Sequence, residues 1–318
     1  MTFADPQMRN LEGLHDWDLR WGWADSALDP GLTAVMRVKN EARSLPFVLP
    51  ALVNAVQRVI VVDNDSDDGT PEVVGEIAAE QDATDRVEIK SYPFRVSRCG
   101  PEHLQTPPDS VHSLAYFYNW SFSGVRTAYS LKWDGDMVLT DDGIAALRRL
   151  AWQLEDVEAI VVIPRHPLYV ADEQTAYFDL EYINLEPFIF PNRPPFGFVK
   201  AFDWELRMLP AGTEWVRLQQ GLHFELKWLD SDEFAHWSVT DFDRSVRVTR
   251  KRRELQIFRD QAAGRMTQGL AKIAAPEGVH VVDYVRKTWL PAQPRPIVST
   301  TSSSPAGEDA GPTGSGAA

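Results

Sequence analysis

The sequence contains almost no cysteine and no long apolar run. Its single cysteine, Cys99, excludes an internal disulfide framework and a zinc site built from cysteines. The first residues show neither a basic start followed by an apolar segment nor a stretch long enough to cross a bilayer. We therefore expect a cytoplasmic protein, whose contact with a membrane would be peripheral and at its inner face.

Positive charge is also scarce. The chain has 32 Lys and Arg against 46 Asp and Glu, which gives a formal net charge of -14. A chain this acidic repels a phosphate backbone, so no nucleic acid is expected among its partners. With 318 residues, 44% of them hydrophobic, it can bury one large core or a core domain with a smaller addition.

Composition divides the chain into four predicted segments. Residues 1–30 carry several tryptophans among acidic residues and form an N-terminal arm. Residues 31–240 form the catalytic domain, and residues 241–296 form a C-terminal helical extension. Residues 297–318 have almost no large apolar side chains and are predicted to be disordered.

The pattern of apolar residues predicts an α/β fold. Short apolar runs alternate with stretches of helical period, which is typical of a mostly parallel central sheet flanked by helices. The predicted strands are residues 32–38, 58–63, 86–92, 127–133 and 159–163. Helices are expected between them at 40–56, from Thr70, around 114–125, and from Thr140.

The second half of the chain has a less regular pattern. Residues 180–237 are rich in aromatic residues and proline without a clear period, which favours an irregular acceptor region. Phe188, Phe190, Phe196 and Phe198 could wall that region or simply pack in the core. Apolar residues from Leu255 to Ile273 then predict a long C-terminal amphipathic helix with a basic beginning.

Polar residues follow three of the predicted strands. They are Lys39-Asn40-Glu41, the run from Asp63 to Thr70, and Asp134-Gly135-Asp136. Ligands of open α/β sheets bind at the carboxyl ends of the strands. Two carboxylates suit a hard divalent cation such as Mn²⁺ or Mg²⁺. Asp-x-Asp recurs elsewhere in this acidic chain, so a solvated turn is the alternative reading of the pattern alone.

Two longer blocks resemble glycosyltransferase family 2. The first is VMRVKNEARSLPFVLPALVNAVQRVIVVDNDSDDGTPEVV, and the second is NWSFSGVRTAYSLKWDGDMVLTDDG. They stand in the order and at the separation usual for that family. The resemblance implies the GT-A fold, which binds nucleotide-diphosphate sugars, and it covers roughly the first half of the chain.

By this resemblance several residues receive roles. Asp63 would bind the base or ribose, and Asp134 and Asp136 would hold the metal that carries the diphosphate. Other residues implied in nucleotide binding are Lys39, Asn40, Glu41, Asp65 and Asn119. Asn40 could instead cap the following helix, and the run from Asp65 to Thr70 could be only a polar turn. Family members often carry Arg where this chain has Tyr118, and Arg95 or Arg98 would then supply the phosphate contact.

The remaining candidates lie in the second half. Phe202 to Arg207 resembles the start of the family's Glu-Asp-x-x-Leu-x-x-Arg helix, which makes Asp203 the first choice for the general base and Glu205 the second. A helix-capping Asp followed by a surface Glu is the alternative. His223 resembles the histidine that completes the metal's ligands, although a histidine between apolar residues can also be part of the core.

The sequence therefore predicts an inverting, metal-dependent glycosyltransferase. Its partners would be a nucleotide-diphosphate sugar and a sugar or lipid-linked acceptor. The basic run at residues 247–253 would make peripheral contact with a membrane, or it is only a solvated helix end. One rival is a nucleotidyltransferase of related fold, but such enzymes normally have a Gly-rich, Arg-containing loop after the first strand. The other is a non-catalytic, carbohydrate-binding descendant of the fold, which would not hydrolyse a donor.

Overall fold

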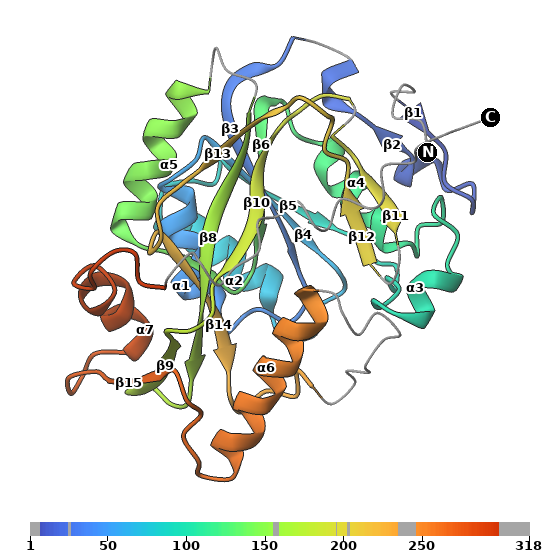
Figure 1. Cartoon of the computed structure of the whole chain (residues 1–318). Coiled ribbons are helices and arrows are strands. Elements are labelled where there is room, and N and C mark those ends of the chain that lie inside the picture. Colours follow the sequence, from blue (N-terminus) through green and yellow to red (C-terminus); the bar gives the residue numbers. More distant parts are fainter. Residues whose placement is uncertain are drawn as a thin grey trace. The chain divides into compact units, whose positions relative to one another are not determined.

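A computed structural model describes residues 7–24, 27–154, 159–194, 196–201, 204–234 and 246–298 (Figure 1). Contacts divide the chain into two compact units. The first comprises residues 1–162 and 187–217, and the second comprises residues 163–186 and 218–318. Residues 163–186 thus group with the C-terminal part, whereas the sequence analysis placed them in the catalytic domain. The four predicted segments stay a prediction.

The first unit contains a sheet with a parallel centre. Its strands are β3 (Asp29–Val38), β4 (Arg58–Asp63), β5 (Val87–Ser91), β6 (Thr127–Asp134), β7 (Met137–Leu139), β10 (Asn184–Pro191), β13 (Glu214–Arg217) and the beginning of β8 (Ala159–Val170). β3 pairs in parallel with β4 on one side and β6 on the other, and β4 pairs in parallel with β5. β10 is antiparallel to β6. The predicted strands and the mostly parallel centre are confirmed.

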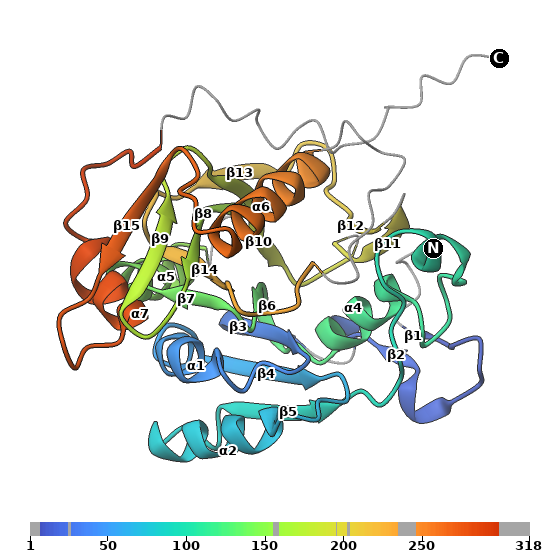
Figure 2. The ribbon, with the colours of Figure 1, turned by 90° about the horizontal axis from the view of Figure 1, so that it is seen from below.

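The helices of the first unit pack on this sheet and on one another. They are α1 (Leu45–Val53), α2 (Thr70–Glu80), α3 (Pro101–Gln105), α4 (Leu114–Ser123) and α5 (Asp141–Gln153). Figure 2 shows α1 and α2 beside β4 and β5, in agreement with their contacts. The predicted start of α5 is confirmed, because the Thr140 hydroxyl accepts a hydrogen bond from the Gly143 backbone N–H at 3.1 Å.

One predicted helix start differs from the structure, and at another the residue that caps the helix differs. The first helix begins at Leu45 rather than near residue 40, because Asn40 has φ 58° and belongs to a loop. Thr70 is the first residue of α2, and the residue before it, Gly69, has φ 84°. The Thr70 hydroxyl therefore does not cap its own helix and is used in the loop contact described below.

The predicted arm is partly ordered by aromatic contacts. It contains β1 (Gln7–Met8), η1 (His15–Trp17), β2 (Leu19–Arg20) and η2 (Gly22–Ala24). The Trp17 ring lies 4.9 Å from Phe94, 5.1 Å from Trp120 and 5.6 Å from Tyr92, measured between ring centroids. Aromatic rings bury much apolar surface, so these contacts fix the arm on the region between β5 and α4.

The second unit combines strands and helices. Its elements are the end of β8, β9 (Thr175–Asp179), β14 (His223–Trp228), α6 (Val246–Ala262), β15 (Leu270–Ala274), α7 (Val281–Tyr284) and the π-helix η3 (Val285–Trp289). β8 pairs antiparallel with β9 and parallel with β14, and β15 extends this sheet beside β9.

The prediction of one long C-terminal helix was wrong. α6 ends at Ala262, and Leu270–Ala274 form β15. Gly264 and Gly269 have φ 67° and 82°, in the left-handed region that ends helices and turns the chain. The apolar residues after 262 therefore belong to a strand, and their match to a helical period was coincidental.

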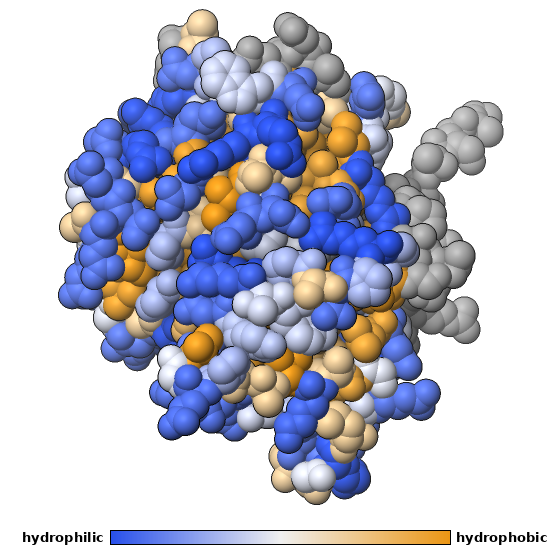
Figure 3. All heavy atoms as spheres, turned by 90° about the vertical axis from the view of Figure 1, so that its left-hand side faces the viewer, coloured by the Kyte–Doolittle hydropathy of each residue, from blue (hydrophilic) through white to orange (hydrophobic). Residues whose placement is uncertain are grey.

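Figure 3 shows a mostly hydrophilic side of the molecule on which hydrophobic side chains form small groups. Among the described residues, no helix combines the length and the hydropathy needed to span a bilayer.

Candidate active site

The register of three parallel strands brings two predicted acidic residues to one edge of the first unit's sheet. On one side of β3, Val38 lies opposite Asp63 of β4. On the other side, Arg37 lies opposite Asp134 of β6. Because parallel strands end at the same edge, Asp63 and Asp134 flank the end of β3 and the Lys39-Asn40-Glu41 loop that follows it (Figure 1).

The loop after β3 is joined to the loop after β4 by hydrogen bonds. The Lys39 ammonium donates to the backbone carbonyls of Asn64 and Asp65, both at 2.8 Å. The Asn40 N–H donates to the Ser66 hydroxyl at 2.9 Å, and the Asn40 side chain accepts from the Asp67 N–H at 3.0 Å. Lys39, Asn40 and Asp65 are thus brought together, and their contacts fix the two loops.

Asp68 and Thr70 complete this connection. Glu41 N–H donates to the Thr70 hydroxyl at 2.8 Å, and Ala42 N–H donates to the Asp68 carboxylate at 3.0 Å. Burial acts to raise the pKa of Asp68, but bonds from Thr70 and from backbone N–H groups outweigh it and lower that pKa. The sequence analysis considered Asp68 as part of a merely polar turn, whereas it holds the loop that carries Glu41.

Asp63 has an unused hydrogen-bond acceptor. Its side chain is nearly buried, with the residue 6% exposed. Oδ2 accepts a bond of 3.3 Å from the Ser66 N–H, while Oδ1 is shielded from water and has no partner among the described residues. An unpaired buried carboxylate oxygen is unfavourable. A ligand that offers an N–H or O–H here would therefore gain a ready acceptor.

The Asp134-Gly135-Asp136 turn lies tightly against Glu41. A Cβ atom added to Gly135 would stand 2.8 Å from Glu41 Cγ and 3.1 Å from Val38 Cγ1. Glycine is therefore needed here for close approach rather than for an unusual backbone angle. The contact places Glu41 beside the two aspartates, as the predicted site requires.

Arg37 is a member of this group that the sequence analysis missed. Its Nη2 lies 2.9 Å from Asp134 Oδ1, and its guanidinium carbon is 3.9 Å from the centre of the Tyr118 ring. Burial acts to lower the pKa of Arg37, but Tyr118, Asp134 and Glu205 outweigh it and raise that pKa. A charged residue inside the apolar run of a central strand was the signal that could have revealed it.

Tyr118 stays a neutral phenol in this surrounding. Burial is the largest cause that raises its pKa well above the ordinary value, and Glu205 adds to the effect. The proposed substitutes for the missing family arginine, Arg95 and Arg98, stay a prediction. Arg95 pairs with Glu102 at 2.7 Å in an exposed position, and the Arg98 backbone N–H donates to the same carboxylate. Arg37 is the arginine that contacts Tyr118.

Glu205 comes from a β-hairpin, so the predicted helix start at this point was wrong. β11 (Phe198–Ala201) pairs antiparallel with β12 (Trp204–Arg207), and Glu205 lies opposite Lys200. Alternation in a strand puts Glu205 and Arg207 on one face. Arg207 is buried on that face, 3.9 Å from the Phe190 ring. Asp203, the first choice for the base, lies outside the described residues.

Asn119 connects the hairpin to α4. Its side-chain oxygen accepts from the Phe198 N–H at 2.7 Å, and its amide nitrogen donates to the Phe198 carbonyl at 2.8 Å. The residue is completely buried. Asn119, which the family resemblance linked to nucleotide binding, therefore holds β11, the strand that pairs with β12 and its Glu205. A contact between Asn119 and a nucleotide stays a prediction.

The aromatic residues predicted as a possible acceptor wall are core residues. All four are buried: Phe188, Phe190, Phe196 and Phe198. The alternative of ordinary packing is therefore the one that holds, because a side chain without exposed surface cannot stack on a sugar ring in this conformation.

A protein-family model matches the segment that forms this edge of the sheet. Residues 10–141 match the family model described as "CgtA: Beta-1,4-N-acetylgalactosaminyltransferase (CgtA)". The resemblance to glycosyltransferases is thereby confirmed, and the matched segment contains Asp63, Asn119, Asp134 and Asp136. A comparison with curated proteins gave no match.

Solved glycosyltransferase-type structures share only weak similarity with the chain. S. aureus TarS 1-349 in complex with UDP is 10% identical with a TM-score of 0.38, and the alignment covers 62% of this chain and 60% of that chain. Glucosyl-3-phosphoglycerate synthase from Mycobacterium tuberculosis with Mn²⁺ and UDP is 13% identical with a TM-score of 0.23, and 47% of each chain is covered. Similarity this low carries no argument about this chain. The chain spans between 36% and 60% of the length of the TarS chains it matches.

The segment that matches the family model offers two carboxylates for a divalent cation. Asp134 is 33% exposed at its side chain and Asp136 is half-buried. No group of three potential ligands occurs in the part of the chain that the structure describes. Two carboxylate groups fit Mn²⁺ or Mg²⁺ only when other oxygens complete the coordination, as the oxygens of a bound diphosphate would.

His223, the third predicted metal ligand, lies outside the segment that matches the family model. It begins β14 in the second unit and is completely buried. Burial, with Arg165 and His166 nearby, lowers the pKa of His223 to about 3, so its ring is neutral at ordinary pH. A neutral ring can ligate a metal or pack in a core, and the metal role stays a prediction.

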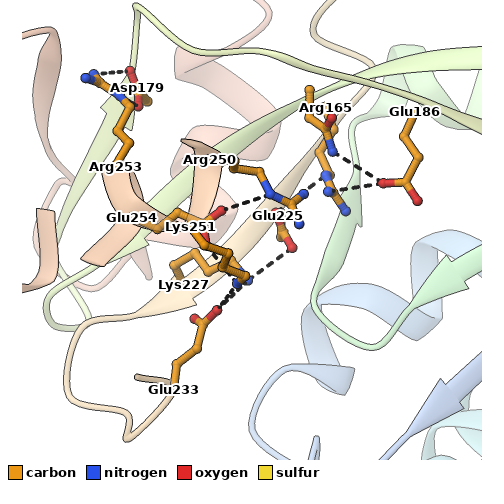
Figure 4. Close-up of polar contacts among 11 residues, drawn as sticks. Arg165, Asp179, Glu186, Glu225, Lys227, Glu233, Arg250, Lys251, Arg253 and Glu254 are labelled. Carbon is orange, nitrogen blue, oxygen red and sulfur yellow. Dashed lines mark hydrogen bonds and ion pairs between the residues drawn. The ribbon is translucent and has the colours of Figure 1, made fainter. Parts of the chain in front are cut away.

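Several residues of the basic run, which lies outside the matched segment, form ion pairs within the second unit (Figure 4). Arg253 Nε lies 2.7 Å from Asp179 Oδ2. Lys251 Nζ lies 2.6 Å from Glu233 Oε1 and 2.8 Å from Glu254 Oε2. Charges already paired attract a lipid surface less, so these residues offer less to a membrane than the sequence suggested.

A further buried network holds α6 near β8 and β14. Glu225 accepts ion pairs from Arg165 at 3.4 Å and Lys227 at 3.0 Å. Burial acts to raise the pKa of Glu225, but Arg165 and Lys227 outweigh it and hold that pKa well below its usual range. Opposite charges thus stabilise each other in the interior of this unit.

Proposed function

We propose that the chain transfers a sugar from a nucleotide-diphosphate donor to an acceptor hydroxyl. The observation that carries this proposal is the alignment of Asp63 and Asp134 on either side of β3 within the segment that matches a glycosyltransferase family. The name of that family makes an N-acetylgalactosamine donor the first to test. The thermal-shift screen with four nucleotides, described below, identifies the base of the nucleotide.

In this proposal, different residues at the sheet edge bind different parts of the donor. Asp63, with its unpaired buried oxygen, accepts a hydrogen bond from the nucleoside. The pocket is shaped by the two joined loops, which carry Lys39, Asn40, Glu41 and Asp65. The hydrogen bonds between the loops leave these residues little freedom to move. A preorganised pocket loses less entropy on binding.

We further propose that Asp134 and Asp136 hold Mn²⁺ or Mg²⁺. A divalent cation, when bound, offsets the charge that develops on the leaving diphosphate. The protein's part is to present two carboxylates at a fixed turn, which Gly135 permits by its close approach to Glu41. His223 is the third ligand predicted from the resemblance.

Inversion of configuration is the stereochemical part of the proposal. The matching family is named for a β-linkage, and a single displacement on an α-linked donor inverts the anomeric centre to give one. Such a displacement needs a base that takes the acceptor proton. Asp203 is the first candidate for the base and Glu205, on the adjoining strand β12, is the second.

The acceptor in this proposal is a sugar, free or lipid-linked, and the protein works in the cytoplasm. A lipid-linked acceptor would bring the chain to the inner face of a membrane through the basic residues of α6. Of these, Arg252 is exposed, while Arg250, Lys251 and Arg253 are in ion pairs.

A thermal-shift screen tests the donor site. UDP, GDP, dTDP and CDP are each added with and without Mn²⁺, to the wild type and to Asp63→Asn. A ligand that binds the native state raises the Tm by mass action. We expect one nucleotide to stabilise the wild type, more strongly with Mn²⁺, and to stabilise Asp63→Asn less.

Activity is tested with the nucleotide sugar that corresponds to the stabilising nucleotide. Slow hydrolysis of the donor, dependent on Mn²⁺, distinguishes a transferase from a carbohydrate-binding protein. If no nucleotide raises the Tm and no donor is hydrolysed, the proposal is wrong.

A further inference from the structure

Arg37 lies in β3 where three functional segments meet. It precedes the Lys39-Asn40-Glu41 loop, and its register partner on β6 is Asp134. Its side chain is only 5% exposed. A guanidinium group carries its charge at every ordinary pH, so this site has a permanent buried cation.

The guanidinium is held on two sides. Asp134 Oδ1 lies 2.9 Å from Nη2, and the Tyr118 and Phe122 rings lie 3.9 Å and 5.6 Å from the guanidinium carbon. Stacking on aromatic faces fixes the plane of the group. The ion pair occupies Asp134 Oδ1 and does not involve Oδ2. Nη1 has no hydrogen-bond partner among the described residues.

A second carboxylate acts on the same cation from another element. Glu205 of β12 interacts electrostatically with Arg37 and with Tyr118. The hairpin that carries Glu205 is itself fixed to α4 by Asn119. Arg37 therefore connects the Asp-Gly-Asp turn, on the donor side, with the hairpin that carries Glu205.

We propose that Arg37 is a positioning residue that holds the Asp134 carboxylate at a fixed place relative to Glu205. Without this cation the two carboxylates would repel each other, and the Asp134 side chain would be free to rotate. This inference rests on the proposed function, because it assigns Asp134 to the donor and the hairpin to the acceptor.

A double-mutant cycle on the ligand-free protein tests the pairing without any assumption about function. The variants are Arg37→Met, Asp134→Asn and the double variant, each unfolded with urea. Asp134→Asn leaves a buried guanidinium without its counter-ion, so we expect it to unfold at lower urea than the double variant. Additive midpoints would show that Arg37 does not hold Asp134.

Kinetics test the positioning role. Arg37→Met is expected to lower kcat about a hundredfold, since a misplacement of about 1 Å can have that effect, and to change the donor KM less than about threefold. Arg37→Lys keeps the charge and should recover at least part of kcat. The matched control is Arg86→Met, because Arg86 is half-buried, donates to the Val53 carbonyl and precedes β5 at the opposite edge of the sheet.

The outcomes separate the two hypotheses. A wild-type kcat in Arg37→Met, or an equal loss in Arg86→Met, overturns the positioning role. A loss of kcat that merely follows the loss of Tm in all variants also overturns it. If the wild type neither binds nucleotide nor hydrolyses a donor, the proposed function fails, while the urea cycle still decides whether Arg37 holds Asp134.

Discussion

Replacing Asn119 by alanine should loosen the hairpin that carries Glu205. The change removes two hydrogen bonds, of 2.7 and 2.8 Å, and leaves the buried N–H and C=O of Phe198 without partners. Each unpaired buried group costs about 1 to 3 kcal/mol, so we expect a loss of about 2 to 4 kcal/mol after some relaxation. For a protein of this size that corresponds to a fall of roughly 3 to 6 °C in Tm.

The consequence for activity distinguishes a structural Asn119 from a nucleotide ligand. We expect Asn119→Ala to keep its nucleotide affinity, measured by calorimetry below the Tm, while kcat falls because the hairpin is displaced. Asn54→Ala is the control, since Asn54 is exposed and should change stability by less than about 0.5 kcal/mol. An Asn119→Ala protein with wild-type stability and lost nucleotide affinity would refute this reasoning and support the role expected from the family.

Further predictions concern the metal, the base, pH and the membrane. Asp136→Ala should abolish turnover and the Mn²⁺-dependent rise in Tm without unfolding the protein; full activity in EDTA would contradict this. Asp203→Asn should reduce kcat by about two to four powers of ten with unchanged donor affinity, and Glu205→Gln should be milder; the reverse order would make Glu205 the base. Burial, with Arg295 nearby, lowers the pKa of His166 to about 3, so the unfolded chain binds more protons below about pH 6.5. His223 has the same lowered pKa, so the two histidines together should lower the stability by about 2.7 kcal/mol per pH unit from pH 6.5 towards 3, and by about half of that in His166→Gln. Binding to anionic liposomes should be weak and salt-sensitive, and strong binding at high salt would contradict the ion pairing seen in α6.

Local sequence determined the central strands and the places where chemistry gathers. Apolar runs such as Arg58–Asp63 end in turn-forming residues, and the strand ends follow directly from that change of composition. The order of the strand ends also predicted which acidic residues share an edge, because parallel strands align their carboxyl ends. The start of α5 at Thr140 followed from a capping hydroxyl.

Local sequence failed where a different element was equally compatible with the pattern. Leu270–Ala274 suited a helix by spacing, and Trp204–Arg207 resembled the start of a helix in the family motif. Both are strands, since strand formation depends on a pairing partner elsewhere in the chain. The aromatic residues around Phe190 were ambiguous for the same reason, because burial is decided by what packs on them.

Only the tertiary structure decided which groups neutralise and hold the candidate site. Arg37 and Asp134 are 97 residues apart, and Asn119 and Phe198 are 79 apart. Such contacts depend on strand register and helix packing, which no local period encodes. The chain's sequence thus specified where the acidic residues stand, and folding supplied the buried arginine and the hydrogen-bonded asparagine that fix the elements around them.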